Sequence, residues 1–307
     1  MYGAVMGLAG LGLSARAAAP VLPGVFRAPA YFTEPWVLFG TIALLILLPA
    51  YAIKLARYPE AVRLDFTSPV QLGFCGALPV GMFLVGGGLA PYFFPLGNFI
   101  WWLGFVVLLA FQVWALSRWL SGSIDLPHIN AGWLIIMVGG IVAPGPGIAL
   151  GHVEASRFIF GISAAAAPIL MALLFYRAII GAPLPEPLRP SWFILLVPPS
   201  LIYANGLALY PEAHFLEALF FFSLVLAAAL LVVSRNFLRW PFGAPWWAFT
   251  FPLDALAYAA ARYAQDHPGA LWTAVCAATL LLATFFVALV LLRTLFAMPR
   301  SVASPRA

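Results

Sequence analysis

Charged residues are scarce in this sequence of 307 residues. Asp, Glu, Lys and Arg together make up 8% of it, whereas a soluble domain carries about 25%. Hydrophobic residues make up 64% and form apolar segments of about 20 residues, the length at which a helix crosses a bilayer. This scarcity of charge excludes a soluble globular domain, and the sequence predicts an all-α polytopic membrane protein.

Cysteines and candidate catalytic groups are scarce as well. The two cysteines, Cys75 and Cys276, lie in apolar segments, so neither a disulfide framework nor a metal site is expected. The four histidines lie near the ends of predicted helices, and no cofactor motif is present. We therefore expect neither an enzyme nor a cofactor. An integral membrane enzyme acting on lipid and a scaffold that only binds partners stay as less favoured alternatives.

Ten apolar segments are expected to cross the membrane, and the connections between them are too short to hold a soluble domain. They lie at residues 1–18, 35–54, 72–94, 97–118, 130–150, 157–176, 191–209, 214–234, 245–263 and 270–292. The first is expected to be a retained helix, because it has no basic leader or cleavage site. We expect one transmembrane domain at 1–296 and a short cytoplasmic tail at 297–307.

The basic residues predict the orientation of the bundle. They stand singly in short connections, so the net charge of +5 does not indicate a partner nucleic acid. Four lie in odd-numbered connections, namely Arg16, Arg27, Arg157 and Arg262. Eleven lie in even-numbered connections or the C-terminal tail, namely Lys54, Arg57, Arg63, Arg118, Arg177, Arg189, Arg235, Arg239, Arg293, Arg300 and Arg306. The positive-inside rule then predicts cytoplasmic N- and C-termini. The ten expected helices favour a bacterial inner membrane or its equivalent.

Central prolines interrupt four of the five odd-numbered segments. Pro79, Pro144, the pair Pro198 and Pro199, and Pro252 recur at intervals of 54 to 65 residues, each near the middle of an odd-numbered segment. Proline at membrane depth is tolerated where protein or a water-filled cavity satisfies the freed backbone groups. The pattern therefore predicts an inner ring of kinked helices around a path and an outer ring against lipid.

The first segment has glycines where the other odd-numbered segments have a central proline. Gly3 and Gly7 are the first two of four glycines there, and glycine can bend a helix or let another backbone approach closely. We expect this segment to be the fifth member of the inner ring, with Gly3 and Gly7 as its bending points. The alternative is that these glycines only mediate helix packing.

Several motifs resemble a known family. They are the run Trp246-Trp247-Ala248-Phe249-Thr250-Phe251-Pro252-Leu253, the segment from Gly132-Trp133 to Pro144 and Gly147, the pair Pro198-Pro199, and the opening Tyr2-Gly3 with Gly7-Leu8. Over essentially the whole chain they look like the tellurite-resistance/dicarboxylate transporter family, which includes bacterial TehA and plant slow anion channels. The resemblance implies five helical hairpins with pseudo-five-fold symmetry and kinked odd-numbered helices around a central pore. It also implies a homotrimer with one pore per subunit, and a phenylalanine plug at Phe251.

The residues support the same interpretation of Phe251. An aromatic ring directly before Pro252, at a bend in the helix, can project into a narrow lumen and close it. The alternative is a ring packed between helices, as expected for most of the 26 phenylalanines. The inner segments have no Lys or Arg near their middles, so we expect weak attraction of anions by helix N-termini. C4-dicarboxylate, chloride or nitrate, and oxyanions such as tellurite or sulfite are the candidate substrates.

Asp254 fits this pattern least well. It is an acidic residue deep in a membrane segment, where a carboxylate is costly and is a functional hypothesis by default. Three interpretations stay open: a proton carrier in a dicarboxylate symporter, a structural partner of a polar group on a neighbouring helix, and a carboxyl that faces away from the pore. Two amides, Asn205 and Gln112, are expected to bridge helices by hydrogen bonds.

Overall fold

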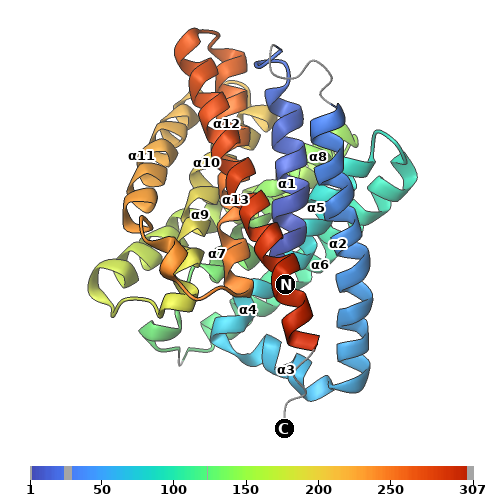
Figure 1. Cartoon of the computed structure of the whole chain (residues 1–307), viewed down its shortest axis with the longest axis vertical. Helices are drawn as coiled ribbons and strands as arrows, with labels where there is room; N and C mark the ends of the chain where they lie inside the picture. Colours follow the sequence, from blue (N-terminus) through green and yellow to red (C-terminus); the bar gives the residue numbers. More distant parts are fainter. Residues whose placement is uncertain (1, 24–29, 123, 303–307) are drawn as a thin grey trace.

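The computed structural model describes residues 2–23, 30–122 and 124–302, and no strand occurs within these ranges (Figure 1). The predicted all-α class is therefore confirmed. Two of the basic residues on which the predicted orientation rests, Arg27 and Arg306, lie outside the described part, as do residues 303–307 of the expected tail.

Among the described residues, ten helical segments lie in the order expected from the sequence, and eight of them are long and apolar enough to cross a membrane. We call the odd-numbered ones inner segments: α1 (Gly3–Ala18), α4 with α5 (Pro69–Cys75, Ala77–Leu89), α7 with η2 and α8 (Gly132–Val138, Gly139–Val142, Pro144–Ala149), η3 with α10 (Glu186–Leu196, Val197–Leu209), and η6 with α12 (Ala244–Ala248, Thr250–Asp266). The outer helices are α2 (Ala30–Arg57), α6 (Phe94–Leu120), α9 (Val153–Ile180), α11 (Glu217–Val233) and α13 (Ala270–Val302). The connections contain α3 (Pro59–Thr67), which the sequence analysis missed, and the short turns η1 (Leu126–His128), η4 (His214–Leu216) and η5 (Phe237–Arg239).

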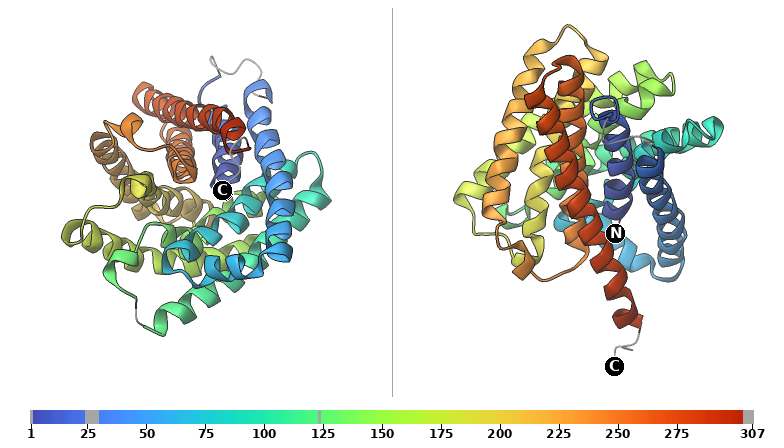
Figure 2. Two further views of the ribbon diagram at one scale, coloured as in Figure 1. Left: turned by 60° about the horizontal axis from the view of Figure 1, so that its bottom comes forward. Right: turned by 45° about the horizontal axis from the view of Figure 1, so that its top comes forward.

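The ten segments form five hairpins around a closed ring. Each inner segment contacts the outer helix that follows it in the chain: α1 with α2, α5 with α6, α8 with α9, α10 with α11, and α12 with α13. The inner segments also contact one another in chain order, and α12 closes the ring against α1. Figure 2 (left) shows the colours of the chain running once around the bundle. This arrangement matches the predicted five-hairpin fold.

Inner segments and outer helices differ in their surroundings. In the three inner segments that contain Val70–Leu89, Gly132–Ala149 and Glu186–Leu209, 72–78% of the apolar window is buried, against 17–39% in the outer helices. The outer helices leave large apolar side chains exposed, such as Leu45, Val225 and Leu281. Because such surface is unfavourable in water, it indicates contact with lipid hydrocarbon.

The central prolines singled out in four inner segments lie at the start of the second helical half. Pro79 is the third residue of α5, Pro144 the first of α8, and Pro252 the third of α12; Pro198 and Pro199 follow the first residue of α10. The first turn of a helix has no intrahelical acceptor for its N–H groups, so proline loses no hydrogen bond there. The proline pattern thus marks the point at which each of these inner segments is interrupted.

Helix α1 differs from the other inner segments. It runs from Gly3 to Ala18 without interruption, so the kink expected at Gly3 and Gly7 is not a break in the helix. An ideal β-carbon at Gly7 would lie 2.1 Å from Oγ1 of Thr250. The glycine therefore lets the backbones of α1 and α12 approach closely, which is the packing alternative considered for it.

Candidate functional site

Two cavities lie inside the ring of inner segments. The first, about 460 Å³ in volume, lies at the N-terminal half of α1; the second, about 280 Å³, lies at its C-terminal half. All five inner segments contribute lining residues to each cavity. The closed ring therefore encloses a lumen with two compartments.

Phe251 and Val142 lie at the boundary between the two compartments. They are the two described residues that line both cavities, and both side chains are at most 5% exposed. Phe251 is the second residue of α12, directly before Pro252. Its ring reaches α1, because an ideal β-carbon at Gly10 would lie 2.9 Å from Cδ2 of Phe251. The Phe251 ring therefore lies at the depth in the lumen at which α12, the second half of its inner segment, begins.

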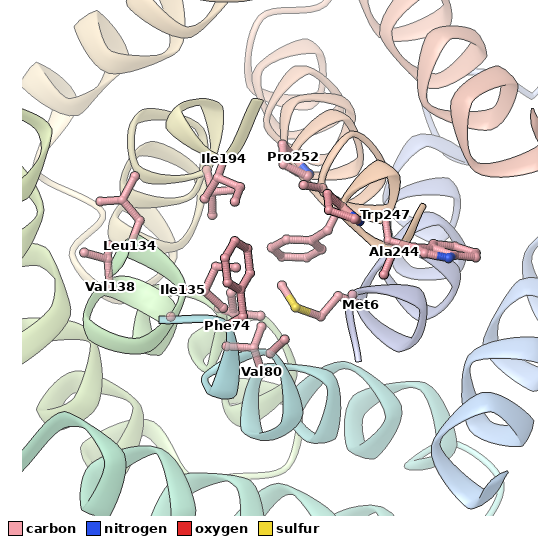
Figure 3. Close-up of a pocket in the computed structure, with 18 of the residues that line it drawn as sticks. Met6, Phe74, Val80, Leu134, Ile135, Val138, Ile194, Ala244, Trp247 and Pro252 are labelled. Atoms are coloured by element: carbon pink, nitrogen blue, oxygen red, sulfur yellow. The ribbon is translucent and has the colours of Figure 1, made fainter. Parts of the chain in front are cut away.

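The first cavity has an apolar wall. Figure 3 shows Met6, Phe74, Leu134, Ile194 and Pro252 surrounding one space from five different inner segments. Among the described lining residues there is no ionisable side chain, and the polar side-chain groups are the Gln71 amide and the Trp247 indole. An ion in this compartment therefore loses water without gaining a charged partner.

The second cavity has more polar side chains in its lining, namely Ser14, Arg16, Asn205 and Tyr258. The Arg16 guanidinium donates to both carboxylate oxygens of Glu34, at 3.0 and 2.5 Å, and to the carbonyl of Gly88 at 3.0 Å. The ion pair joins α1 to α2 and leaves little uncompensated charge at this rim of the lumen.

Tyr92 lies at the same rim, in the connection between α5 and α6. Burial and a hydrogen bond with Glu34 raise the pKa of Tyr92. The Tyr92 hydroxyl therefore keeps its proton more firmly than an ordinary tyrosine and does not add charge to the mouth of the second cavity.

Asp254 lies behind the wall of the lumen. Its side chain is fully buried, and neither carboxylate oxygen has a hydrogen-bond partner among the described residues. The carboxyl faces α1, where an ideal β-carbon at Gly10 would lie 2.9 Å from Oδ2. The hydroxyl of Ser14 donates to the Asp254 carbonyl at 2.8 Å. Asp254 itself lines neither cavity, although its helical neighbours Phe251 and Ala255 do.

The structure brings together some of the residues singled out from the sequence. Gly3, Pro198, Phe251 and Pro252 line the first cavity, whereas Pro79, Pro144, Pro199, Gly7 and Asp254 line neither cavity among the described lining residues. Phe249 belongs to an aromatic cluster with Phe193, Phe237, Trp240, Trp246 and Phe286, away from the lumen.

The two amides bridge helices as expected. Asn205 donates to the carbonyl of Ile141 at 2.7 Å, and Gln112 donates to the carbonyl of Met137 at 2.9 Å and to the Ser163 hydroxyl at 3.0 Å. Val142 could not be singled out from the sequence, because an aliphatic residue at a constriction of the lumen has the same local sequence pattern as one in a packed core.

Comparison with known proteins places this geometry in a family. S-type anion channel SLAH3 of Arabidopsis thaliana is 25% identical over 262 residues, which cover 84% of this chain and 41% of the plant protein. Guard cell S-type anion channel SLAC1 of the same plant is 24% identical, covering 76% of this chain and 43% of the relative. The chain thus spans less than half the length of these plant relatives. An uncharacterized transporter of Methanocaldococcus jannaschii is 24% identical, with 70% of each chain covered.

A family profile gives the broadest match. The profile of the SLAC1 family, described as voltage-dependent anion channel, matches residues 1–295. This family and the relatives above are channels and transporters, not enzymes. The chain belongs to the SLAC1 family of anion channels, as the motifs in its odd-numbered segments predicted.

Proposed function

We propose that this protein lets small anions cross a membrane through the lumen of its helix ring, and that the Phe251 ring closes the lumen. The observation that carries the proposal is that Phe251 and Val142 line both compartments. A buried aromatic ring at an apolar constriction excludes a hydrated ion by its bulk and by dewetting. The relatives that are named as anion channels support the same activity.

The N-termini of the second helical halves attract an anion weakly as it passes through the lumen. The second helical halves α5, α10 and α12 begin at Ala77, Val197 and Thr250, next to the first cavity. Helix N-termini carry partial positive charge, which favours an anion. With no ionisable side chain among the described residues of this wall, the attraction stays too weak to trap the ion, which suits conduction.

The apolar wall favours anions that give up water easily. Chloride and nitrate carry a single charge, so their transfer into the first cavity costs less than that of doubly charged C4-dicarboxylates, tellurite or sulfite. Liposomes that contain the protein test this proposal when nitrate, chloride and sulfate influx are compared with protein-free liposomes. We expect nitrate and chloride influx to exceed sulfate influx, and equal rates with and without protein would refute the activity.

A proton-coupled dicarboxylate symporter is the second candidate function. The observation that favours it is the fully buried Asp254 carboxyl without a described partner, one helical turn from Phe251. A carboxyl that can exchange a proton beside the lumen would couple anion movement to a pH gradient.

Assembly and orientation complete the proposal. We propose a homotrimer in which each subunit has its own pore, located in a bacterial inner membrane with both termini in the cytoplasm. The exposed apolar side chains of the outer helices support contact with lipid and with neighbouring subunits. The excess of basic residues in even-numbered connections supports the orientation.

A further inference from the structure

The second cavity contains a buried hydrogen-bond acceptor that lacks a donor. Asn205 is 2% exposed, and its Nδ2 donates to the carbonyl of Ile141. That bond fixes the orientation of the amide, because Nδ2 must face the carbonyl. Oδ1 is therefore the free end, and no described residue donates to it. A buried acceptor in this state is unfavourable unless a donor from outside the protein occupies the cavity.

A second polar group lies close to this acceptor. An ideal β-carbon at Gly145 would lie 3.4 Å from Asn205 Oδ1 and 3.7 Å from the hydroxyl oxygen of Tyr258. Asn205, Gly145 and Tyr258 all line the second cavity. Because glycine has no side chain, no β-carbon occupies the position that faces both the amide oxygen and the phenol hydroxyl. The cavity thus offers one acceptor and one donor to the same small molecule.

We propose that Asn205, Tyr258 and Gly145 form a binding subsite for a small monoanion that carries both a charged oxygen and a hydroxyl group, with hydrogencarbonate as the example. The hydroxyl group of the anion donates to Asn205 Oδ1, and the Tyr258 hydroxyl donates to the charged oxygen. The proposal rests on the proposed function, because it names a class of anion that stops in the lumen on its way through.

The fixed acceptor gives the subsite its specificity. Nitrate and hydrogencarbonate are both planar anions with three oxygens and one negative charge, and they differ in the hydroxyl hydrogen. Nitrate presents only acceptors, so it leaves Asn205 Oδ1 without a donor and places two acceptors against each other. A site built to bind a hydroxyl group discriminates strongly against an analogue that lacks one. Arg16 cannot supply this discrimination, since it is paired with Glu34 and a charge attracts both anions.

Binding of ¹³C-labelled hydrogencarbonate to the full chain in nanodiscs, followed by the width of its NMR line, tests the subsite. We expect line broadening by the parent protein, and we expect unlabelled hydrogencarbonate to reverse it at a concentration at least about fivefold lower than nitrate does, which corresponds to one hydrogen bond. Equal displacement by the two anions, or no broadening, would mean that only water occupies the cavity and would overturn the proposal.

Gly145→Ala is the most informative variant. Its new methyl group meets Asn205 and Tyr258 at ordinary contact distances and lies inside a helix, so the fold is retained while the space between the two polar groups is filled. The matched control is Gly161→Ala on the outer helix α9, where an ideal β-carbon meets nothing within 4 Å. We expect the first variant to abolish the broadening and the second to keep it; broadening that survives Gly145→Ala would refute the subsite.

Two further pairs of variants test the polar groups one at a time. Asn205→Leu removes the acceptor, and its control Gln112→Leu removes a buried amide that also bridges to a backbone carbonyl and has a free oxygen, but lines neither cavity. Tyr258→Phe removes the donor, and its control Tyr203→Phe removes a buried tyrosine hydroxyl that also lacks a described partner but lines neither cavity. We expect about fivefold weaker hydrogencarbonate binding in each test variant and none of this loss in the controls.

A current measurement separates the failure of this inference from the failure of the proposed function. In planar bilayers with nitrate on one side and hydrogencarbonate on the other, the reversal potential of the Phe251→Ala protein reports their relative permeability. If the Phe251→Ala protein and the double variant Phe251→Ala/Gly145→Ala both carry anion current with the same reversal potential, the subsite is refuted and the anion pore is retained. If hydrogencarbonate binding is lost or weakened in the test variants and kept in their controls, but no anion current is measured, the pore is refuted and the subsite is retained.

Discussion

Replacing Phe251 by alanine is expected to join the two compartments of the lumen. The phenyl ring lines both the cavity of about 460 Å³ and the cavity of about 280 Å³, so its removal leaves Val142 as the remaining shared side chain. Dehydrating an ion at an apolar constriction costs several kcal/mol, and every ~1.4 kcal/mol removed from the barrier raises the rate about tenfold. We therefore expect the variant to conduct at least about tenfold faster than the parent.

The assay for Phe251→Ala is nitrate or chloride influx into liposomes, normalised to the amount of folded protein. The matched control is Phe285→Ala, because Phe285 lies on α13 with 54% of its surface exposed and does not line the lumen. Phe249→Ala is a poor control: Phe249 is fully buried in an aromatic cluster, and the change would cost about 3–5 kcal/mol of stability. Unchanged influx in folded Phe251→Ala protein would refute the gate.

Three further predictions concern packing, assembly and orientation. Gly7→Ala should lower the thermal stability of the protein, because the new methyl group would lie 2.1 Å from Thr250 Oγ1; unchanged thermal unfolding in detergent would contradict the close packing of α1 on α12. Mass measurement in detergent should return a trimer, and a monomer or dimer alone would count against that assembly. Single cysteines near Arg63 and Arg239, in a background without the two native cysteines, should react only with membrane-permeant thiol reagents in intact cells. Labelling by an impermeant reagent would reverse the orientation.

The local chemistry of proline explains why most of the fold could be predicted from the sequence. Pro144 and Pro252 interrupt apolar segments, and proline allows a second helix to begin at or just before it. The central prolines recur at intervals of 54 to 65 residues, each long enough for one pair of helices, and this spacing predicts the five hairpins. Glycine has two possible effects, bending and close packing, which the sequence cannot separate. In α1 an ideal β-carbon at Gly7 would lie 2.1 Å from Thr250 Oγ1, which supports the packing alternative.

The lumen was predictable only in part, because its walls are formed by residues far apart in the chain. Phe251 could be singled out from its place before Pro252 and from the motif around it. The residues that surround the proposed subsite in the second cavity could not be singled out in this way, because they come from four different inner segments: Ser14, Gly145, Asn205 and Tyr258. Asn205 was predicted to bridge helices, and its Nδ2 does so. Its free Oδ1 became visible only once the neighbouring segments were in place.

Asp254 provides the test between passive and proton-coupled transport. Its carboxyl faces the backbone of α1 at Gly10 and meets no described polar side chain, so the interpretation as a structural partner gains no support from the described contacts. Asp254→Asn keeps the shape of the side chain but cannot exchange a proton. If the carboxyl carries protons, a pH gradient should drive anion uptake by the parent, and the variant should lose this drive while passive anion exchange continues.

Proton movement during anion transport is the decisive measurement for Asp254. A pH-sensitive dye inside the liposomes reports it directly, and the parent, Asp254→Asn and a Phe285→Ala control are compared at the same anion gradient. A change of the pH inside the liposomes that accompanies anion transport in the parent and in the control, but not in Asp254→Asn, would establish symport. A parent protein that moves anions without moving protons would eliminate it. The carboxyl would then be a buried group behind the wall of the lumen, next to Gly10 of α1, the same glycine that the Phe251 ring approaches.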